Sequence, residues 1–308
     1  MARSVAHSSE GLVYLTDSTL AYAGRHVHER AHVIHTHSFM EIAFVVAGQG
    51  THHCLAGHQE LQVGHVILLR PGVWHGYDNC QNLILYNCCF GTDLLQRELA
   101  WTREDPLLSY LLWTGPLSMQ RRGMLTATLE PETLHECEIH LDALERLRLK
   151  PRELHRGDII GRLSLLLGQV ARAVAADRQG LSQPAGLLHP TVMQAMQLLE
   201  TRLAHRWSLF ELAEELHLAP GYLVRLFKAA TGLPPMAYLS RCRVESAAAL
   251  LLDTTDPVSQ IGQAVGWPDQ NYFARRFKAH FGLSATAYRK RFTSNRAQLG
   301  AWPNTDAS

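Results

Sequence analysis

The stretch FKAATGL at residues 227–233 occurs again as FKAHFGL at residues 277–283. An Ala-Tyr pair and an arginine follow each copy at matching places, so eight positions are identical at one offset of 50 residues. In the first copy the identical positions are Phe227, Lys228, Ala229, Gly232, Leu233, Ala237, Tyr238 and Arg241. Self-similarity at a fixed offset indicates that the chain builds the same supersecondary unit twice.

Each unit has the pattern of a helix-turn-helix. In the first unit, Ser208 and Glu211 have the spacing of a capping box, which predicts that a helix begins at residue 209. Ala-Pro-Gly at 219–221 is a turn, and Gly232 is expected to end the second helix. In the second unit, residues 257–266 and 271–282 are the two predicted helices, around a turn at Trp-Pro-Asp. A long helix over 235–252 is expected to join the units.

The second helix of each unit suits the major groove of DNA. Arg225 and Arg275 stand two residues before the phenylalanine of each copy, and arginine pairs bidentately with guanine. Gln270 and Asn271 open the later helix, where amides can read adenine and backbone N–H groups can meet phosphate. One such arginine is usually a solvated surface charge, but two at equivalent places favour DNA recognition. Two rigidly held helices can enter successive groove turns, about 34 Å apart.

The basic charge is concentrated in the same part of the chain as the two predicted helix-turn-helix units. Residues 1–186 contain 16 Lys and Arg against 19 Asp and Glu, whereas residues 187–293 contain 12 against 8. Residues 271–293 contain six basic residues and no acidic one. A local basic region is typical of a surface that binds nucleic acid.

Residues 11–90 read as short strands separated by turns, among them Gly-Gln-Gly at 48–50 and Asp-Asn at 78–79, a pattern that favours a sandwich or barrel. Apolar residues then recur at helical spacing over 134–144 and 159–173. These two stripes either pack on the barrel or form a dimer seam, since the same spacing occurs in coiled coils. Gly, Pro and Ser over 179–190 indicate a linker.

From about residue 190 to 292, the sequence resembles the AraC/XylS family of bacterial transcription regulators, above all in GWPDQNYFARRFKAHFGLSATAYRKR at 266–291. The resemblance implies DNA binding by two helix-turn-helix units, and it favours an activator, with RNA polymerase as a further partner. It places the base-reading positions on Gly221, Val224, Arg225, Gln270, Asn271, Ala274 and Arg275. Lys228, Arg276 and Lys278 on the same helices complete the predicted DNA-binding residues.

Histidine is concentrated at the other end of the chain, with 11 of 18 in residues 1–75. His35, His37, Glu41 and Gly48 match the first cupin motif, and Gly72, His75 and Asn79 match part of the second, although Gly64 to Pro71 is one residue too long. Parity along one strand would put the first two histidines and the glutamate on one face, with the third histidine on a neighbouring strand.

Three imidazoles and a carboxylate suit a divalent metal such as zinc, iron, nickel or manganese. The predicted metal ligands are therefore His35, His37, Glu41 and His75, and the predicted effector site adds Trp74. The alternative is that these side chains hydrogen-bond the hydroxyls of a sugar without any ion. The other early histidines, His26, His28, His32, His52 and His53, are interpreted as solvated.

Composition excludes several other classes. The 308 residues are 46% hydrophobic and 19% charged, an ordinary globular balance for about two domains. No apolar run approaches the roughly 20 residues of a membrane span, and the N-terminus lacks a signal-peptide pattern. Six cysteines without a CxxC pair predict reduced thiols. We therefore expect a cytoplasmic protein with no membrane association.

These observations predict an α+β protein. Residues 1–178 would form a cupin-like, ligand-sensing β-barrel with a helical dimerisation segment, 179–190 a linker, and 191–293 an all-α domain with two helix-turn-helix units. The predicted function is a homodimeric, sequence-specific transcription regulator, controlled by a small-molecule effector such as a sugar, and not an enzyme. The alternative is a metal-dependent cupin enzyme, an isomerase or dioxygenase, fused to a DNA-binding module; no further acid–base pair or nucleophile stands out to support it.

Overall fold

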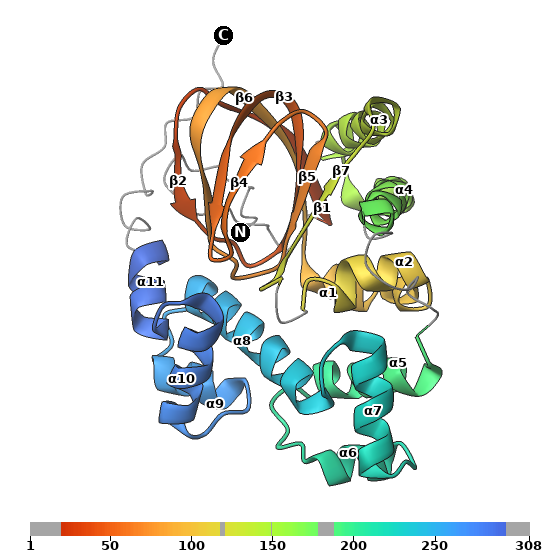
Figure 1. The fold of residues 1–308 in the computed structure, drawn as a ribbon, viewed down its shortest axis with the longest axis vertical. Helices are drawn as coiled ribbons and strands as arrows, with labels where there is room; N and C mark the ends of the chain where they lie inside the picture. The colour runs from red at the N-terminus through yellow and green to blue at the C-terminus, as the bar shows by residue number, and fades with distance from the viewer. Residues whose placement is uncertain (1–19, 118–120, 149, 178–187, 294–308) are drawn as a thin grey trace.

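The computed structural model describes residues 20–117, 121–148, 150–177 and 188–293. An antiparallel sheet with helices on one side forms the N-terminal domain, residues 20–177, and a group of helices forms the C-terminal domain, residues 188–293 (Figure 1). Most of the predicted linker lies outside the described residues. The predicted α+β architecture, with strands first and helix-turn-helix units last, is confirmed.

The sheet has seven strands in the described residues and curls into a barrel-like shape (Figure 1). Its order is β1-β6-β3-β5-β7, with β2 also paired to β6 and β4 to β3, and all pairs are antiparallel. The strands are β1 Ala21–His28, β2 His32–His35, β3 Met40–Cys54, β4 Gly57–Leu61, β5 His65–Leu69, β6 His75–Phe90 and β7 Met124–Thr128.

The two long strands differ from the sequence-based expectation, which placed turns at residues 48–50 and 78–79. Strands β3 and β6 run through these segments, and the register between them shifts three times. Gly48, with φ of 71°, lies opposite Asn82, and a side chain there would collide with the backbone of Asn82. Asn79 and Asn82 also have positive φ. The residues that suggested turns therefore form bulges within continuous strands.

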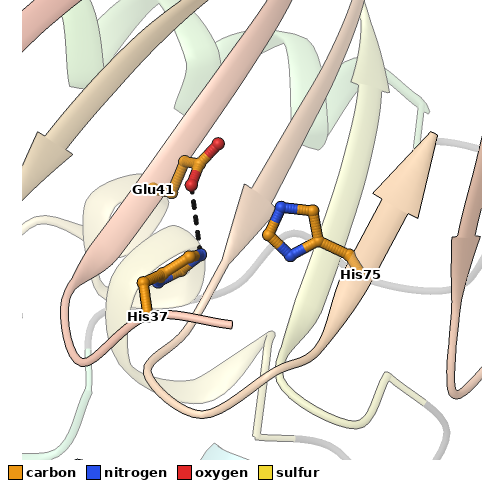
Figure 2. A group of neighbouring side chains, drawn as sticks. All are labelled: His37, Glu41 and His75. Atoms are coloured by element: carbon orange, nitrogen blue, oxygen red, sulfur yellow. Dashed lines mark ion pairs between the residues drawn. The ribbon is translucent and has the colours of Figure 1, made fainter. Parts of the chain in front are cut away.

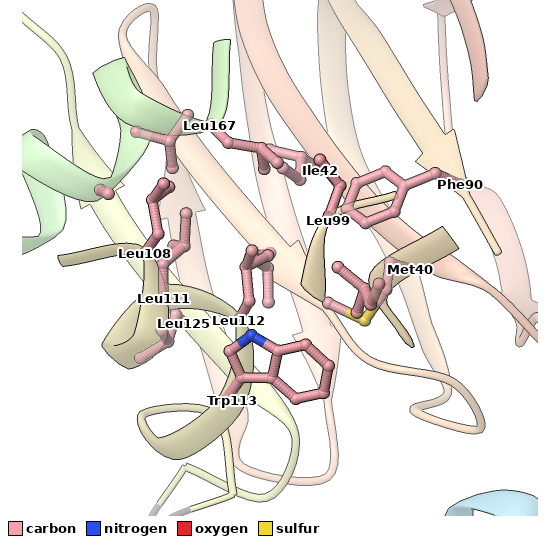
Figure 3. Close-up of a cluster of buried hydrophobic side chains, with 14 of the residues drawn as sticks. Met40, Ile42, Phe90, Leu99, Leu108, Leu111, Leu112, Trp113, Leu125 and Leu167 are labelled. Carbon is pink, nitrogen blue, oxygen red and sulfur yellow. The ribbon is translucent and has the colours of Figure 1, made fainter. Parts of the chain in front are cut away.

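Helices cover one side of the sheet. Met40, Ile42 and Phe90 of the sheet pack against Leu111, Trp113 and other apolar side chains of the helical segments (Figure 3). These segments are α1 Thr92–Gln96, η1 Ala100–Arg103, α2 Pro106–Ser109, η2 Tyr110–Thr114, α3 Pro131–Leu147 and α4 Arg152–Asp177.

The two predicted helical stripes lie on α3 and α4, and both are buried within the chain. Leu134 and Leu141 of α3, and Leu163 and Leu166 of α4, belong to the core of the domain. Packing on the N-terminal domain therefore accounts for both stripes. Residues 154–177 of α4 are long and apolar enough to span a membrane by length and composition, but the stripe of this helix is core.

The C-terminal domain confirms the duplicated unit. The Ser208 side chain accepts from the Glu211 N–H at 3.0 Å, and the Glu211 carboxylate accepts in return, so the capping box is present. Gly232 and Gly282, 50 residues apart, end equivalent helices in the same left-handed conformation. The helices are α5 Pro190–Thr201, α6 Leu209–Glu215, α7 Pro220–Thr231, α8 Pro235–Asp253, α9 Val258–Ala264, α10 Gln270–Phe281 and α11 Ala285–Thr293.

Candidate functional site

Helices α7 and α10 are the second helices of the two units, and they present most of the predicted DNA-binding residues to solvent. Their inner faces are fixed by Phe227 in one unit and by Phe273 and Phe277 in the other, all buried. The exposed predicted residues are Gly221, Arg225, Lys228, Gln270, Asn271, Ala274, Arg275 and Lys278. The outward faces of both helices are therefore accessible to a duplex.

Two of the predicted DNA-binding residues are less accessible. Val224 is half-buried. Arg276 is also half-buried, and its Nε donates to the Ser240 hydroxyl of α8 at 3.0 Å. Arg276 is thus engaged inside the domain.

Sequence reasoning missed one exposed pair of aromatic residues. Tyr222 and Tyr272 are equivalent in the repeat, and 45% and 40% of their surfaces are exposed. The Arg225 guanidinium lies 6.0 Å from the Tyr222 ring centre, and Arg275 lies 5.9 Å from that of Tyr272. Both helices therefore carry the same Tyr–Arg pair, within reach of a weak cation–π interaction. The offset of 50 residues was the signal that could have found it.

In the N-terminal domain, His37, Glu41 and His75 converge inside the barrel (Figure 2). Each of the three offers one ligand atom, and these atoms all lie within 4.8 Å of one another. His37 Nε2 lies 3.1 Å from Glu41 Oε2. All three residues are buried. Residues from separate segments thus come together where the sequence motif placed them.

The segments that deliver these residues differ from the expected single strand. His35 ends β2 and pairs with His75 at the start of β6, whereas His37 follows β2 and Glu41 lies on β3. The Nδ1 of His37 is held by the Phe39 carbonyl at 2.7 Å. Residues 37–39, between β2 and β3, do not belong to a strand. Alternation along one strand therefore does not explain why the three side chains converge.

Two predicted members lie outside the three-residue cluster. The ring of His35 lies 4.2 Å from that of His75, but its Nδ1 is bonded to the Val33 carbonyl, and it does not belong to the closest donor set. The indole N–H of Trp74 donates to the carbonyl oxygen of Phe281, in the C-terminal domain. The indole is thus engaged at the boundary between the domains.

His52 was interpreted as solvated, and this was wrong: it is fully buried, with its ring 5.7 Å from that of His75 and 5.4 Å from that of Tyr77. The bulges in β3 change which residues face inward, so simple alternation from Glu41 selects the wrong one of the His52–His53 pair. No regular period in the sequence would have found it.

Burial dominates the electrostatics of the cluster. It lowers the pKa of His35 to about 3, that of His52 to about 4, and that of His75 well below its ordinary value. Burial alone would raise the pKa of Glu41, but the adjacent His37 outweighs this effect and lowers the pKa to about 2. Glu41 is therefore charged and the rings of His35, His52 and His75 are neutral, which are the forms in which such side chains bind metals.

Several polar atoms of this region are buried without a hydrogen-bond partner among the described residues. They are Glu41 Oε1, both ring nitrogens of His52, His75 Nε2 and the Tyr77 hydroxyl. Each unsatisfied group costs about 1–3 kcal/mol. Native proteins rarely leave such groups together, so the cluster has the character of a place for water, an ion or a polar ligand.

The donor set fits a metal such as zinc in kind: two imidazoles and a carboxylate are a known ligand set that leaves a position open. The donor atoms, which lie within 4.8 Å of one another, are spaced slightly too widely for a bound zinc ion. Zinc bonds of about 2.0–2.1 Å put tetrahedral ligand atoms roughly 3.4 Å apart. The donors would have to approach one another to hold the ion.

A separate cavity of about 300 Å³ lies between the two domains. Arg70 and Trp113 line it from the N-terminal domain, and Tyr238 and Glu245 from the C-terminal domain. Arg70 Nη2 lies 2.8 Å from Glu245 Oε2, and both side chains are buried. The charged groups of this cavity therefore already have partners.

Comparisons with known proteins match the N-terminal domain to a ligand-binding domain and the C-terminal domain to a helix-turn-helix domain. Residues 17–130 match the model of the AraC-like ligand binding domain, and residues 212–291 match that of a helix-turn-helix domain. The transcriptional activator RhaR of Klebsiella pneumoniae is 25% identical over 259 residues, 83% of this chain and 87% of its own. RhaR of Pectobacterium carotovorum is 25% identical over 279 residues, 91% of this chain and 93% of its own.

Among solved structures, ToxT of Vibrio cholerae has the same overall fold. The match has a TM-score of 0.52 at 12% sequence identity, and it covers 89% of this chain and all of ToxT. With a ligand-binding domain followed by two helix-turn-helix units, the chain is a member of the AraC family of transcription regulators.

Proposed function

We propose that this regulator is an activator that binds a specific DNA sequence through α7 and α10, and that a small-molecule effector in the N-terminal barrel controls it. The observation that carries the DNA-binding half is the exposed Tyr–Arg pair at equivalent places of two helix-turn-helix units. The relatives named as transcriptional activators support activation rather than repression.

Selection from a random duplex library tests this half of the proposal. The full chain should enrich a site whose two parts lie one helical turn, about 10 bp, apart on one face of the DNA. Enrichment of no sequence at all would contradict sequence-specific recognition.

The unsatisfied polar atoms around His52, His75 and Tyr77 support the effector site. A sugar offers hydroxyl groups that both donate and accept, and therefore matches imidazole nitrogens and a phenol. His37, Glu41 and His75 can hold a divalent metal in the same place. The ion would act as a Lewis acid toward a ligand oxygen.

A homodimer that contacts RNA polymerase in the cytoplasm is part of the proposal. Ile139 on α3 and Leu165 on α4 are 48% and 57% exposed, outside the buried stripes. Exposed apolar side chains on both helices support the proposed contact with a second copy. The enzyme alternative would require turnover of a bound ligand, and the activator relatives argue for a sensor instead.

Zinc should stabilise the full chain. At 100 times its dissociation constant, a metal that binds only the folded state adds about 2.7 kcal/mol to the free energy of unfolding. Thermal unfolding with and without zinc measures this gain, and the same assay with a panel of sugars tests the effector class. His37→Ala should abolish the zinc gain, whereas His135→Ala, an exposed histidine on α3, should keep it. An equal gain in the His37 variant would place the ion elsewhere.

A further inference from the structure

A short segment of the N-terminal domain, residues 70–75, is docked on the second helix-turn-helix unit. The Trp74 indole donates to the Phe281 carbonyl of α10 at 3.0 Å. The Tyr288 hydroxyl of α11 donates to the Gly72 carbonyl at 2.9 Å. A part-buried hydrogen bond from Trp74 to α10 and a buried one from α11 to Gly72 fix the position of this unit relative to the barrel.

The segment approaches helices α8 and α10 closely. Gly72 has φ of 82°, and a Cβ there would lie 2.7 Å from the Ala248 side chain and 2.8 Å from the Phe281 ring. Any larger residue would push α8 and α10 away from the barrel. The absence of a side chain at Gly72 therefore allows the backbone of the segment to lie directly on the second unit.

His75 of the histidine cluster ends this segment, and residues 35–37 lie beside it. Trp74 precedes His75, and Thr36 lies between His35 and His37. The Thr36 hydroxyl is 3.0 Å from that of Tyr288 and 3.3 Å from the Val73 carbonyl. His35, His37 and His75 are thus each next in sequence to a residue that contacts α10 or α11.

We propose that this contact, made by Thr36, Gly72 and Trp74 with Phe281 and Tyr288, transmits occupancy of the histidine cluster to the second helix-turn-helix unit. The inference rests on the proposed metal site. An ion draws its donors together, which moves His37 and His75 and with them the neighbouring contact residues. Filling the cluster tightens the docking of α10 and α11 on the barrel, and undocking in turn weakens ion binding, because coupling between two sites is reciprocal.

Calorimetric titration of zinc into the full chain tests the coupling. Tyr288→Phe keeps the ring that packs on Phe277 and Phe292 but removes the hydroxyl. We expect zinc affinity to fall about fivefold in this variant, the lower range of allosteric coupling. Trp74→Phe, which removes the indole donor, should act in the same direction. Tyr86→Phe is the matched control, because its hydroxyl bonds only within the N-terminal domain, to Asp142 and Glu145.

The possible results distinguish a failure of the proposed coupling from a failure of the proposed metal site. Reduced zinc affinity in the Tyr288 and Trp74 variants, with Tyr86→Phe unchanged and all three folded by circular dichroism, supports the coupling. Wild-type affinity in both contact variants overturns the coupling and leaves the metal site standing. A wild-type chain that does not bind zinc overturns both. Hydrogen exchange at residues 281–288 gives a second readout, since zinc should slow it in the wild type and not in His37→Ala.

Discussion

Replacing Arg70 with methionine is expected to lower the free energy of unfolding by about 3–5 kcal/mol, because a buried charge loses its partner. Arg70 Nε and Nη2 donate to the Glu245 carboxylate at 2.8–3.0 Å, and Nη1 donates to the Leu112 carbonyl at 2.6 Å. Burial disfavours the charge of the guanidinium, but Glu245 outweighs this effect and raises its pKa. The pair therefore stays ionised between the two domains.

A second variant separates the loss of the pair from the loss of packing. In Arg70→Met with Glu245→Leu, neither charge remains, and apolar replacements of buried ion pairs are often neutral or stabilising. The double variant should therefore recover most of the stability in urea unfolding. A loss below about 1 kcal/mol in the single variant would be typical of a solvated surface pair and would contradict its burial.

The C-terminal domain was largely predictable because its information is local. The capping box at Ser208, the glycines that end α7 and α10, and the helical spacing of apolar residues each act within a few residues of chain. The duplication then repeated the terminal glycine and the apolar spacing in the second unit. The position of Arg276 was not predictable in this way, because its side chain donates a hydrogen bond to Ser240 on α8, a contact between helices distant in sequence.

The histidine cluster was predictable only in part, because its geometry depends on where the strands bulge. The motif correctly brought His37, Glu41 and His75 together. It did not reveal His52, since three register shifts in β3 separate that residue from the start of the strand. Inward and outward alternation holds only between such shifts.

The contacts between domains left no pattern in the sequence. Arg70 meets Glu245 across 175 residues, and Trp74 meets Phe281 across 207. Trp74 was expected in the effector site because sugars and aromatic ligands dock on aromatic rings, but tertiary packing decided where its ring lies. An aromatic residue beside a motif can serve the neighbouring domain instead.

A chain in which Arg225 and Arg275 are both alanine is expected to lose about 2–6 kcal/mol of specific DNA-binding free energy. Each bidentate pairing with guanine is worth about 1–3 kcal/mol. The two side chains lie on separate helices, α7 and α10, so their losses should add to within about 0.5 kcal/mol (Figure 1). Titration of the selected duplex with the single and double variants measures this sum.

The pattern of the loss identifies what each arginine contacts. Base reading predicts that each single variant relaxes the preference at one base pair, and that the two positions lie in different halves of the site. A uniform loss on all sequences, with the salt dependence reduced by about one counterion per arginine, would instead assign the side chains to phosphates. Arg97→Ala, an exposed arginine of the N-terminal domain, should leave binding unchanged. Because Tyr222 and Tyr272 flank the two arginines identically, both single variants should behave alike if the duplicated helices read DNA in the same way.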